Sequence, residues 1–201
     1  MDTETLETPL LGAPYEGGYF GGILLINGIR HGIAWAPKQY QFRSEILDCD
    51  SRIIEAAGSF SDSAANTLAL LEAGSPAAKQ VSELTINGIQ DWVLPARDVV
   101  EMGYRNLKPT TRKNYCSFRD GENPSSVPPG MLYTPDLPGQ TLVEAFREGA
   151  EEAFDGDVYW SSTIDPRGYA FCQDFDDGDQ FSSNLYNVGL VRAVRQIRLD
   201  P

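Results

Sequence analysis

Turn-forming residues recur along the whole chain and limit the folds that it can adopt. The 201 residues include 19 glycines and 13 prolines, a number that is high for a helix-rich protein and suits short strands joined by ordered loops. A chain of this length can bury one sizeable core. We therefore expect a single α+β body whose loops carry much of its function.

Two β-rich regions stand at the ends of the chain. Residues 19–35 contain two such runs around Asn27-Gly28, a pair that tolerates positive φ and predicts a β-hairpin. The C-terminal quarter alternates apolar runs with turns, and the acidic turn "DDGD" joins two of these runs. The pattern predicts strands over residues 158–163, 168–175, 181–187 and 190–197.

Helical spacing and helix-terminal residues predict helices in the middle of the chain. Alanines and leucines recur over residues 59–74, with Gly74 where a C-cap is expected, and Pro76 stands near the first turn of a helix over 76–84. A third helix, 96–107, has Asp98 in its first turn, as the helix dipole favours. A fourth is predicted over residues 142–154. In the expected α+β fold, two or three helices pack on short antiparallel strands.

The sequence divides into three segments. Residues 1–18 form an extended N-terminal arm, because Pro9, Pro14 and the Gly17-Gly18 pair resist regular structure, and such an arm can dock on a partner. Residues 19–58 form a β-hairpin lead-in, and residues 59–201 form the main domain. Within that domain, residues 110–140 are rich in Pro, Ser, Gly and Asn. Loops of this length in compact domains are usually functional or bound to a partner.

Charge and cysteine content limit the partners and the compartment. The formal net charge of −13 argues against a nucleic-acid partner and against adhesion to anionic lipid. We expect no signal peptide and no membrane insertion, because the first residues lack a basic and then apolar region and no apolar run approaches about 20 residues. Cys49, Cys116 and Cys172 cannot all pair within one chain. Free thiols and synthesis in the cytoplasm are therefore expected.

The residues that could support catalysis are sparse. His31 is the only histidine and lies in the predicted hairpin, far in sequence from the Ser161-Ser162 pair. The glycine-rich stretch at 17–22 precedes a strand and not a helix, so it does not form a phosphate-binding loop. These observations predict a protein that is not an enzyme.

A cluster of carboxylates is the one candidate metal site. Asp174, Asp176, Asp177 and Asp179 have a spacing similar to that of a calcium loop, but the later bidentate glutamate of an EF-hand is missing. A solvated acidic turn is the first interpretation of this cluster, and a calcium site is the alternative. No other cofactor is expected.

A combination of motifs resembles a known domain family. The stretch "DSAANTLALLEAGSPAAKQVSELTINGIQDWVLPARDVVEMGYRNLKPTT" is followed by "YWSST", by the aromatic and acidic "FDDGD", and by "VRAVR". Together, the WxLP, YWSST and VRxVR motifs resemble the family that ends the legionella collagen-like adhesins and recurs in tailed-phage and prophage proteins. The resemblance covers residues 62–198. It implies a C-type-lectin-like fold, the group that also contains the formylglycine-generating enzymes and the phage major tropism determinant.

The resemblance also implies a core and argues against two activities. The "VRAVR" strand becomes central to the sheet, and the expected core residues are Trp92, Leu94, Tyr104, Trp160, Val191 and Val194. The calcium-dependent sugar site of many C-type lectins needs two tripeptides that this chain lacks, and Glu122-Asn123-Pro124 has the wrong order. Formylglycine-generating enzymes rely on a pair of nearby cysteines, whereas Cys172 is alone in the final third of the chain.

Loops remain as the expected binding elements. The candidates are residues 110–140, 164–169, the acidic turn and residues 184–188, whose Tyr, Asn and Asp content is similar to that of antibody binding sites. The candidate ligand-binding residues are Tyr115, Tyr133, Asp165, Arg167, Tyr169, Gln173, Asp174, Asp176, Tyr186 and Asn187.

These expectations lead to one main functional hypothesis and two alternatives. The main hypothesis is a non-enzymatic bacteriophage virion protein, made in the host cytoplasm, that decorates a capsid or tail fibre or binds a host-surface glycan or protein. Its N-terminal arm would contact other virion proteins, and a homo-oligomer, for example a trimer, is expected. One alternative is an intracellular enzyme or ligand-binding domain related to formylglycine-generating enzymes, with its pocket near Cys172. The other is a purely structural cement protein.

Overall fold

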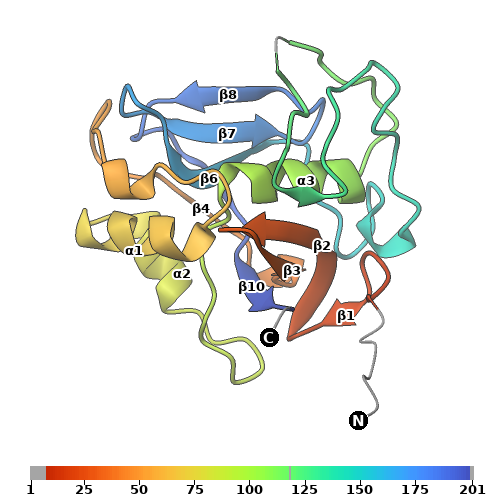
Figure 1. Cartoon of the computed structure of the whole chain (residues 1–201), viewed down its shortest axis with the longest axis horizontal. Coiled ribbons are helices and arrows are strands. Elements are labelled where there is room, and N and C mark those ends of the chain that lie inside the picture. The colour runs from red at the N-terminus through yellow and green to blue at the C-terminus, as the bar shows by residue number, and fades with distance from the viewer. Residues whose placement is uncertain (1–7, 118, 200–201) are drawn as a thin grey trace.

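Two β-sheets form the frame of the described part of the chain, and three α-helices pack against them (Figure 1). The structure is a computed structural model that describes residues 8–117 and 119–199. The mixture of helices with mainly antiparallel strands confirms the α+β class that the sequence predicts.

The first sheet contains the predicted N-terminal hairpin. Asn27 and Gly28 both adopt positive φ, 51° and 78°, and they connect the two long strands as expected for a tight hairpin turn. The strand order is β1-β2-β3-β10, with β5 also paired to β2. These strands are β1 (Pro14–Tyr15), β2 (Gly18–Ile26), β3 (Ile29–Trp35), β5 (Ser126–Val127) and β10 (Val194–Arg198).

The second sheet holds most of the C-terminal strands. Its order is β4-β9-β6-β7-β8, and its pairs are antiparallel except for β6 with β9. The strands are β4 (Phe42–Ser44), β6 (Val158–Ile164), β7 (Ala170–Asp174), β8 (Gln180–Ser183) and β9 (Gly189–Val191).

The last predicted strand is wrong because its residues divide between the two sheets. Residues 190–197 do not form one strand, because β9 belongs to the second sheet and β10 to the first. Arg192 and Ala193 connect them. The "VRAVR" motif is therefore not a central strand but the crossing point between the two sheets. The predicted strand over 181–187 is also shorter, since a turn closed by the amide of Asn187 and the carbonyl of Asn184 follows β8.

Local capping explains the first two helices. The Asp62 side chain accepts a hydrogen bond from the amide of Ala65, and Ser75 accepts one from the amide of Ala78. Gly74 has φ +88° just after the first helix, where a left-handed residue ends a helix well. The helices are α1 (Ser63–Glu72), α2 (Pro76–Ser82) and α3 (Arg97–Leu107). The single-turn 3₁₀ helices are η1 (Lys38–Tyr40), η2 (Glu55–Ala57) and η3 (Glu144–Phe146).

The predicted helix over residues 142–154 is wrong, since only η3 forms there. The amide of Glu148 donates to the carbonyl of Pro109, outside the segment, and the amide of Glu152 donates to the carbonyl of Ala145, seven residues back. Gly149 has φ +82°. Other amides of the segment donate three residues back, as those of Phe146, Arg147 and Ala150 do, so short turns and one tertiary bond take the place of the predicted i to i−4 bonds.

The described part of the expected N-terminal arm, residues 8–18, packs against the rest of the same chain. Residues 1–7 lie outside the described residues. The amide of Gly12 donates to the carbonyl of Phe20, and β1 pairs with β2. The lead-in, residues 19–58, likewise shares both sheets with the rest of the chain, because β3 pairs with β10 and β4 pairs with β9.

Two buried clusters form the core. One lies around Trp92 and Trp160, between α1, α2 and the second sheet, and the other lies around Trp35 and Phe154, where α3 packs between the sheets. The six core residues expected from the sequence are all buried: Trp92, Leu94, Tyr104, Trp160, Val191 and Val194.

A fully buried ion pair holds the crossing point between the sheets. The Arg192 side chain has no exposed surface, and its Nε donates to the carbonyl of Ala36, just after β3, at 2.8 Å. Its other nitrogens donate to the Glu152 carbonyl at 2.8 Å and to Glu152 Oε2 at 2.6 Å. The guanidinium lies over the Phe154 ring at 4.6 Å. Every part of this cation therefore contacts a hydrogen-bond acceptor or an aromatic face.

We expect Glu152→Ala to destabilise the fold by about 3 kcal/mol or more, because it leaves the Arg192 charge buried without its carboxylate. Urea unfolding followed by circular dichroism measures this free energy. Glu151→Ala, at an exposed neighbour, is the matched control and should change stability by less than about 0.5 kcal/mol. Equal losses in the two variants would contradict the importance of the buried pair.

Candidate ligand-binding surface

A long irregular segment covers α3 and one side of the second sheet. We call residues 108–142, between α3 and η3, the loop layer; among its described residues, the two-residue β5 is the only strand and there is no helix. Figure 1 shows these loops above and beside α3, near β7 and β8. Buried side chains of α3 and of the residue that follows it hold this layer at two places.

The first holding point is Lys108, just after α3. The residue is 1% exposed, and its Nζ donates to Asn114 Oδ1 at 2.7 Å and to the carbonyls of Arg112 and Pro138. Asn114 Nδ2 in turn donates to the Pro138 carbonyl at 3.0 Å. Burial lowers the pKa of Lys108. Backbone carbonyls of the loop thus take the place of water around a buried cation.

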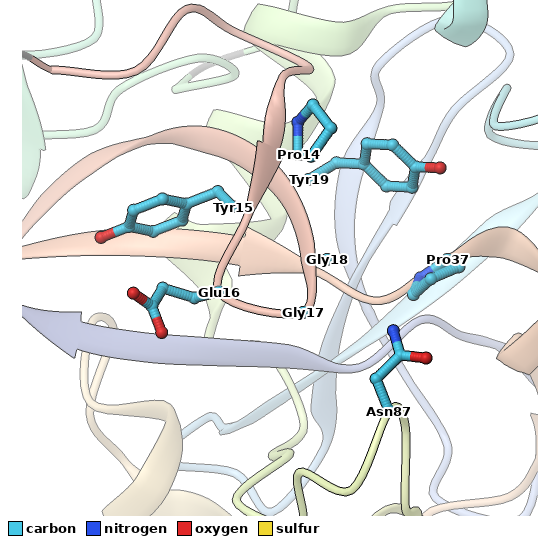
Figure 2. A pocket seen from close by; sticks show the side chains of 8 residues that line it. All are labelled: Pro14, Tyr15, Glu16, Gly17, Gly18, Tyr19, Pro37 and Asn87. Atoms are coloured by element: carbon cyan, nitrogen blue, oxygen red, sulfur yellow. The ribbon is translucent and has the colours of Figure 1, made fainter.

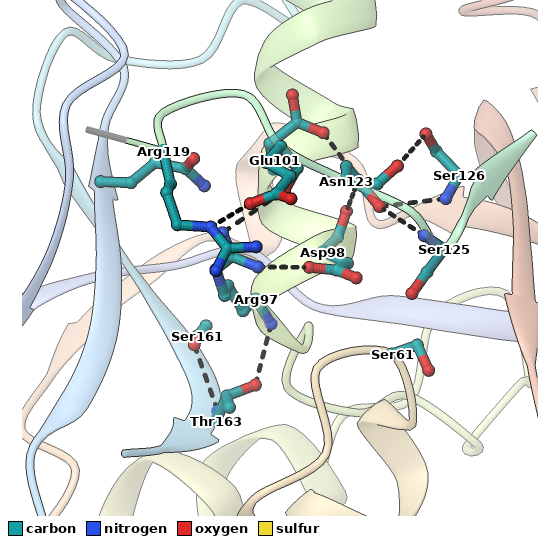
Figure 3. Close-up of polar contacts among 12 residues, drawn as sticks. Ser61, Arg97, Asp98, Glu101, Arg119, Asn123, Ser125, Ser126, Ser161 and Thr163 are labelled. Atoms are coloured by element: carbon teal, nitrogen blue, oxygen red, sulfur yellow. Dashed lines mark hydrogen bonds and ion pairs between the residues drawn. The ribbon is translucent and has the colours of Figure 1, made fainter. Parts of the chain in front are cut away.

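The second holding point is Glu101, which has no exposed surface. It accepts hydrogen bonds from Tyr133 Oη at 2.9 Å and Asn123 Nδ2 at 2.6 Å, and it pairs with Arg105 at 2.7 Å. Figure 3 shows Asn123 between the helix and the loop backbone, where its Oδ1 accepts from the amide of Ser126. Burial raises the pKa of Glu101. Asn123 and Tyr133 lie in different parts of the loop layer, so their hydrogen bonds to Glu101 hold these parts in one conformation.

The expected binding residues fall into three exposure classes. Four are exposed: Tyr115, Arg167, Tyr186 and Asn187. Three are half-buried: Tyr169, Asp174 and Asp176. The other three lie inside the protein, and their expected display on the surface is wrong: Tyr133, Asp165 and Gln173.

Hydrogen bonding explains the three interior residues. Gln173 Nε2 donates to Tyr133 Oη at 3.0 Å, so both belong to the support of the loop layer. Asp165 accepts from the amides of Arg167 and Tyr169 and thereby closes its own turn. Polar loop residues were expected to face a partner, but here their side chains satisfy the backbone.

The exposed candidates gather at the two ends of the β7–β8 hairpin. Ala170 pairs with Ser183, so the turn that carries Arg167 and Tyr169 and the loop that carries Tyr186 and Asn187 lie at one end. The acidic turn forms the other end. The amide of Tyr115 donates to the Asp177 carbonyl at 2.8 Å, which places the loop layer beside that turn.

The acidic turn uses its carboxylates internally. Asp174 Oδ1 accepts from the amide of Asp176 at 2.8 Å, and Asp177 Oδ1 accepts from the amide of Asp179 at 3.1 Å. Asp176 also pairs with Arg112. Burial raises the pKa of both Asp174 and Asp179. Among the described residues, no group of three or more His, Cys, Asp or Glu side chains is arranged to hold a metal ion.

The residues considered for catalysis have structural partners. His31 lies on β3 of the first sheet, where its Nδ1 is 3.0 Å from the Ile29 carbonyl. Ser161 and Ser162 are buried in β6 of the second sheet. The three cysteines are free. Cys172 is buried, and burial raises the pKa of its thiol, which keeps it protonated and unreactive.

Four hollows of about 300 Å³ or more lie on the described surface, and two of them are larger than the others. One, of about 380 Å³, borders the β1–β2 turn, and Figure 2 shows the rings of Tyr15 and Tyr19 projecting in different directions from this turn. The other, of about 360 Å³, opens where the loop layer meets β7 and β8 and includes Arg97 in its wall. We call the second one the Arg97 hollow.

No protein-family model matches the chain, and no curated protein or solved structure matches it. Within residues 8–117 and 119–199, no helix has both the length and the apolar character needed to cross a bilayer.

The pH dependence of stability should report on Asp98, which has no exposed surface and accepts a hydrogen bond from Arg97 at 3.0 Å. Burial raises its pKa, so the folded state binds the proton more tightly than the unfolded state. The resulting stabilisation is fully present below the ordinary aspartate pKa of about 4 and is lost as pH rises through the higher folded-state value.

Asp98→Asn should therefore flatten the decline in unfolding free energy as pH rises above about 4, by at most about 1.4 kcal/mol per pH unit. Urea unfolding at several pH values measures the slope. Asp48→Asn, at an exposed position, should leave the slope unchanged. If the unfolding free energy of Asp98→Asn and of the unmodified protein changed equally with pH, Asp98 would have the same pKa in the folded and unfolded states.

Proposed function

We propose that the chain is a non-enzymatic recognition protein of tailed-phage particles, with a C-type-lectin-like domain that contacts the host surface. The observation that carries the proposal is the loop layer, an irregular segment ordered by Lys108 and Glu101 beneath it. An ordered loop surface on a rigid support loses little conformational entropy when it binds. The motif resemblance supplies the phage context.

Exposed polar and aromatic groups at the ends of the β7–β8 hairpin support binding. Tyr115 is 51% exposed and Tyr186 is 46% exposed. Tyrosines of this kind offer large, rigid contact area together with a hydroxyl group. They surround a hairpin whose backbone is fixed in the second sheet, which is the arrangement expected of a recognition surface.

The alternative of an enzyme related to the formylglycine-generating group receives less support. Its chemistry would need a reactive thiol, and the buried Cys172 is held as a protonated thiol. The chamber next to Cys172 has a volume of only about 10 Å³. This volume holds about one water-sized group and leaves no room for a larger substrate beside this sulfur.

A structural cement role is the second candidate, because exposed apolar side chains mark the loop layer. Leu142 is 87% exposed, Met131 is 75% exposed and Leu137 is 66% exposed. Apolar groups that recur on one segment favour contact with another protein. A homo-oligomer or a neighbouring virion protein would cover them, and this role is compatible with the same particle location.

Purified native particles test the proposed location. Mass spectrometry should find the chain in stoichiometric amounts, and a cryo-electron-microscopy map should show it as a repeated subunit. Outward-facing ends of the β7–β8 hairpin would support host recognition, whereas burial of the loop layer against a neighbour would support the cement role. Absence of the chain from particles would refute both roles.

The double variant Tyr169→Ala/Tyr186→Ala should weaken binding of the protein to host cells by about tenfold or more, because tyrosines often carry much of the binding energy at interfaces. Quantitative cell-binding assays measure the loss, and thermal unfolding should show that the fold is retained. Leu68→Ala, at an exposed position on α1, is the control and should bind normally. Unfolding of the double variant would show instead that these tyrosines support the core.

A further inference from the structure

The Arg97 hollow is built from parts of the chain that are far apart in sequence. Phe60 comes from the segment before α1, Arg97 begins α3, and Phe171 and Gln180 come from β7 and β8. The loop layer closes the remaining side with Ser117, Arg119 and Asp120. A volume of about 360 Å³ lies within the range of small-molecule sites.

A smaller chamber lies beside the hollow. It shares Arg97, Phe171 and Gln180 with the hollow and is also lined by Val100, Ser161, Cys172 and Gln173. Its volume of about 10 Å³ is enough for roughly one water-sized group. The site therefore has an outer part for a small molecule and an inner part for a single polar group.

Arg97 is held in place before any ligand arrives. Its guanidinium carbon lies 4.7 Å from the centre of the Phe60 ring and 5.7 Å from that of Phe171. Its NH1 donates to Asp98 Oδ1 at 3.0 Å, and its NH2 lies 3.4 Å from the Glu122 carbonyl. Figure 3 shows the Asp98 bond and the link from the Arg97 backbone to Thr163. These contacts use two of the five N–H donors of the guanidinium, so donors remain for a planar anion.

The arginines that line the hollow keep hydrogen-bond donors for an anion. Arg119 is a second cation, and its side chain is 63% exposed and paired only with Glu122 among the described residues. Asp120 is a carboxylate in the wall; it is buried and accepts a hydrogen bond from the amide of Ser117 at 2.7 Å. Because Arg97 is paired with Asp98 and Arg119 with Glu122, the attraction for an anion comes from their remaining N–H donors and not from a net positive charge.

The amide oxygen of Gln173 lacks a hydrogen-bond partner, which is an independent indication of a ligand site. The residue is 1% exposed, and its Nε2 donates to Tyr133 Oη at 3.0 Å and to the Gly178 carbonyl at 3.2 Å. Because a carbonyl can only accept, this bond fixes the orientation of the amide. Its Oε1 is buried without a hydrogen-bond partner, and it belongs to a residue that lines the inner chamber. A buried acceptor left unpaired is costly, so this chamber suits a hydrogen-bond donor.

We propose that the Arg97 hollow binds a small carboxylate ligand that also carries a hydroxyl or amide N–H group. The carboxylate pairs with Arg97 and Arg119, the carbon skeleton lies against Phe60 and Phe171, and the donor group enters the chamber and bonds Gln173 Oε1. This inference does not depend on the virion role. Failure of ligand binding would leave the particle experiments unaffected, and failure of the virion role would leave this site unaffected.

Titration of the full isotope-labelled chain by nuclear magnetic resonance tests the site with four small probes. L-lactate and N-acetylglycine carry both groups, propionate lacks the donor, and lactamide lacks the carboxylate. We expect saturable shifts of the Arg97 Nε–H and Gly121 amide signals with lactate or N-acetylglycine at millimolar concentrations. Propionate should bind at least about threefold more weakly, and lactamide should not saturate. Preference for lactate would identify a hydroxyl as the donor, and preference for N-acetylglycine an amide.

Two arginine variants make the test specific. Arg119→Gln should weaken binding of the preferred probe by about twofold to fivefold, as expected for loss of one exposed ion pair. Arg112→Gln is the matched control, because Arg112 is also exposed in the loop layer and paired with a carboxylate but does not line the hollow. The proposal would be overturned by the absence of saturable shifts, by equal binding of lactamide, or by equal effects of the two variants.

Discussion

The buried guanidinium of Arg192 is the interaction on which the arrangement of the two sheets depends. It contacts the end of β3 through the carbonyl of Ala36 and the segment before β6 through Glu152, and it does so from the residues that join β9 to β10. A cation without exposed surface is tolerated only where every donor is satisfied. The chain therefore leaves the second sheet and enters the first at Arg192, and this residue divides the "VRAVR" motif between β9 and β10.

A second set of buried polar groups, on α3 and just after it, holds the loop layer in place. Glu101 and Arg105 project from α3, and Lys108 follows it, so one helix packed between the sheets also supports the loop layer. These groups lose hydration on burial, and the raised pKa of Glu101 and the lowered pKa of Lys108 reflect that cost. In return, these side chains hold the loop layer in one conformation, although regular strand pairing does not support it.

The sequence contained the local information but not the contacts between distant segments. Asn27-Gly28 predicted the hairpin correctly because positive φ is a property of those two residues, and the capping residues Asp62 and Ser75 likewise act within a few residues. Residues 142–154 have helical spacing, yet they form short turns, and the amide of Glu148 bonds to the distant carbonyl of Pro109. The Arg97 hollow was missed for the same reason, since its walls meet only after α3, β7 and the loop layer have packed together.

Gln173 links the support of the loops to the hollow beside them. Its Nε2 bonds Tyr133, Tyr133 bonds Glu101, and its Oε1 is buried without a hydrogen-bond partner in a residue that lines the chamber. A hydrogen bond to Oε1 would satisfy the last polar atom of this amide, so a ligand in the chamber would also stabilise the loop layer. By linkage, this stabilisation would grow with the free ligand concentration relative to the Kd of the folded state. Gln173 would thus couple occupancy of the proposed site to the order of the loop layer.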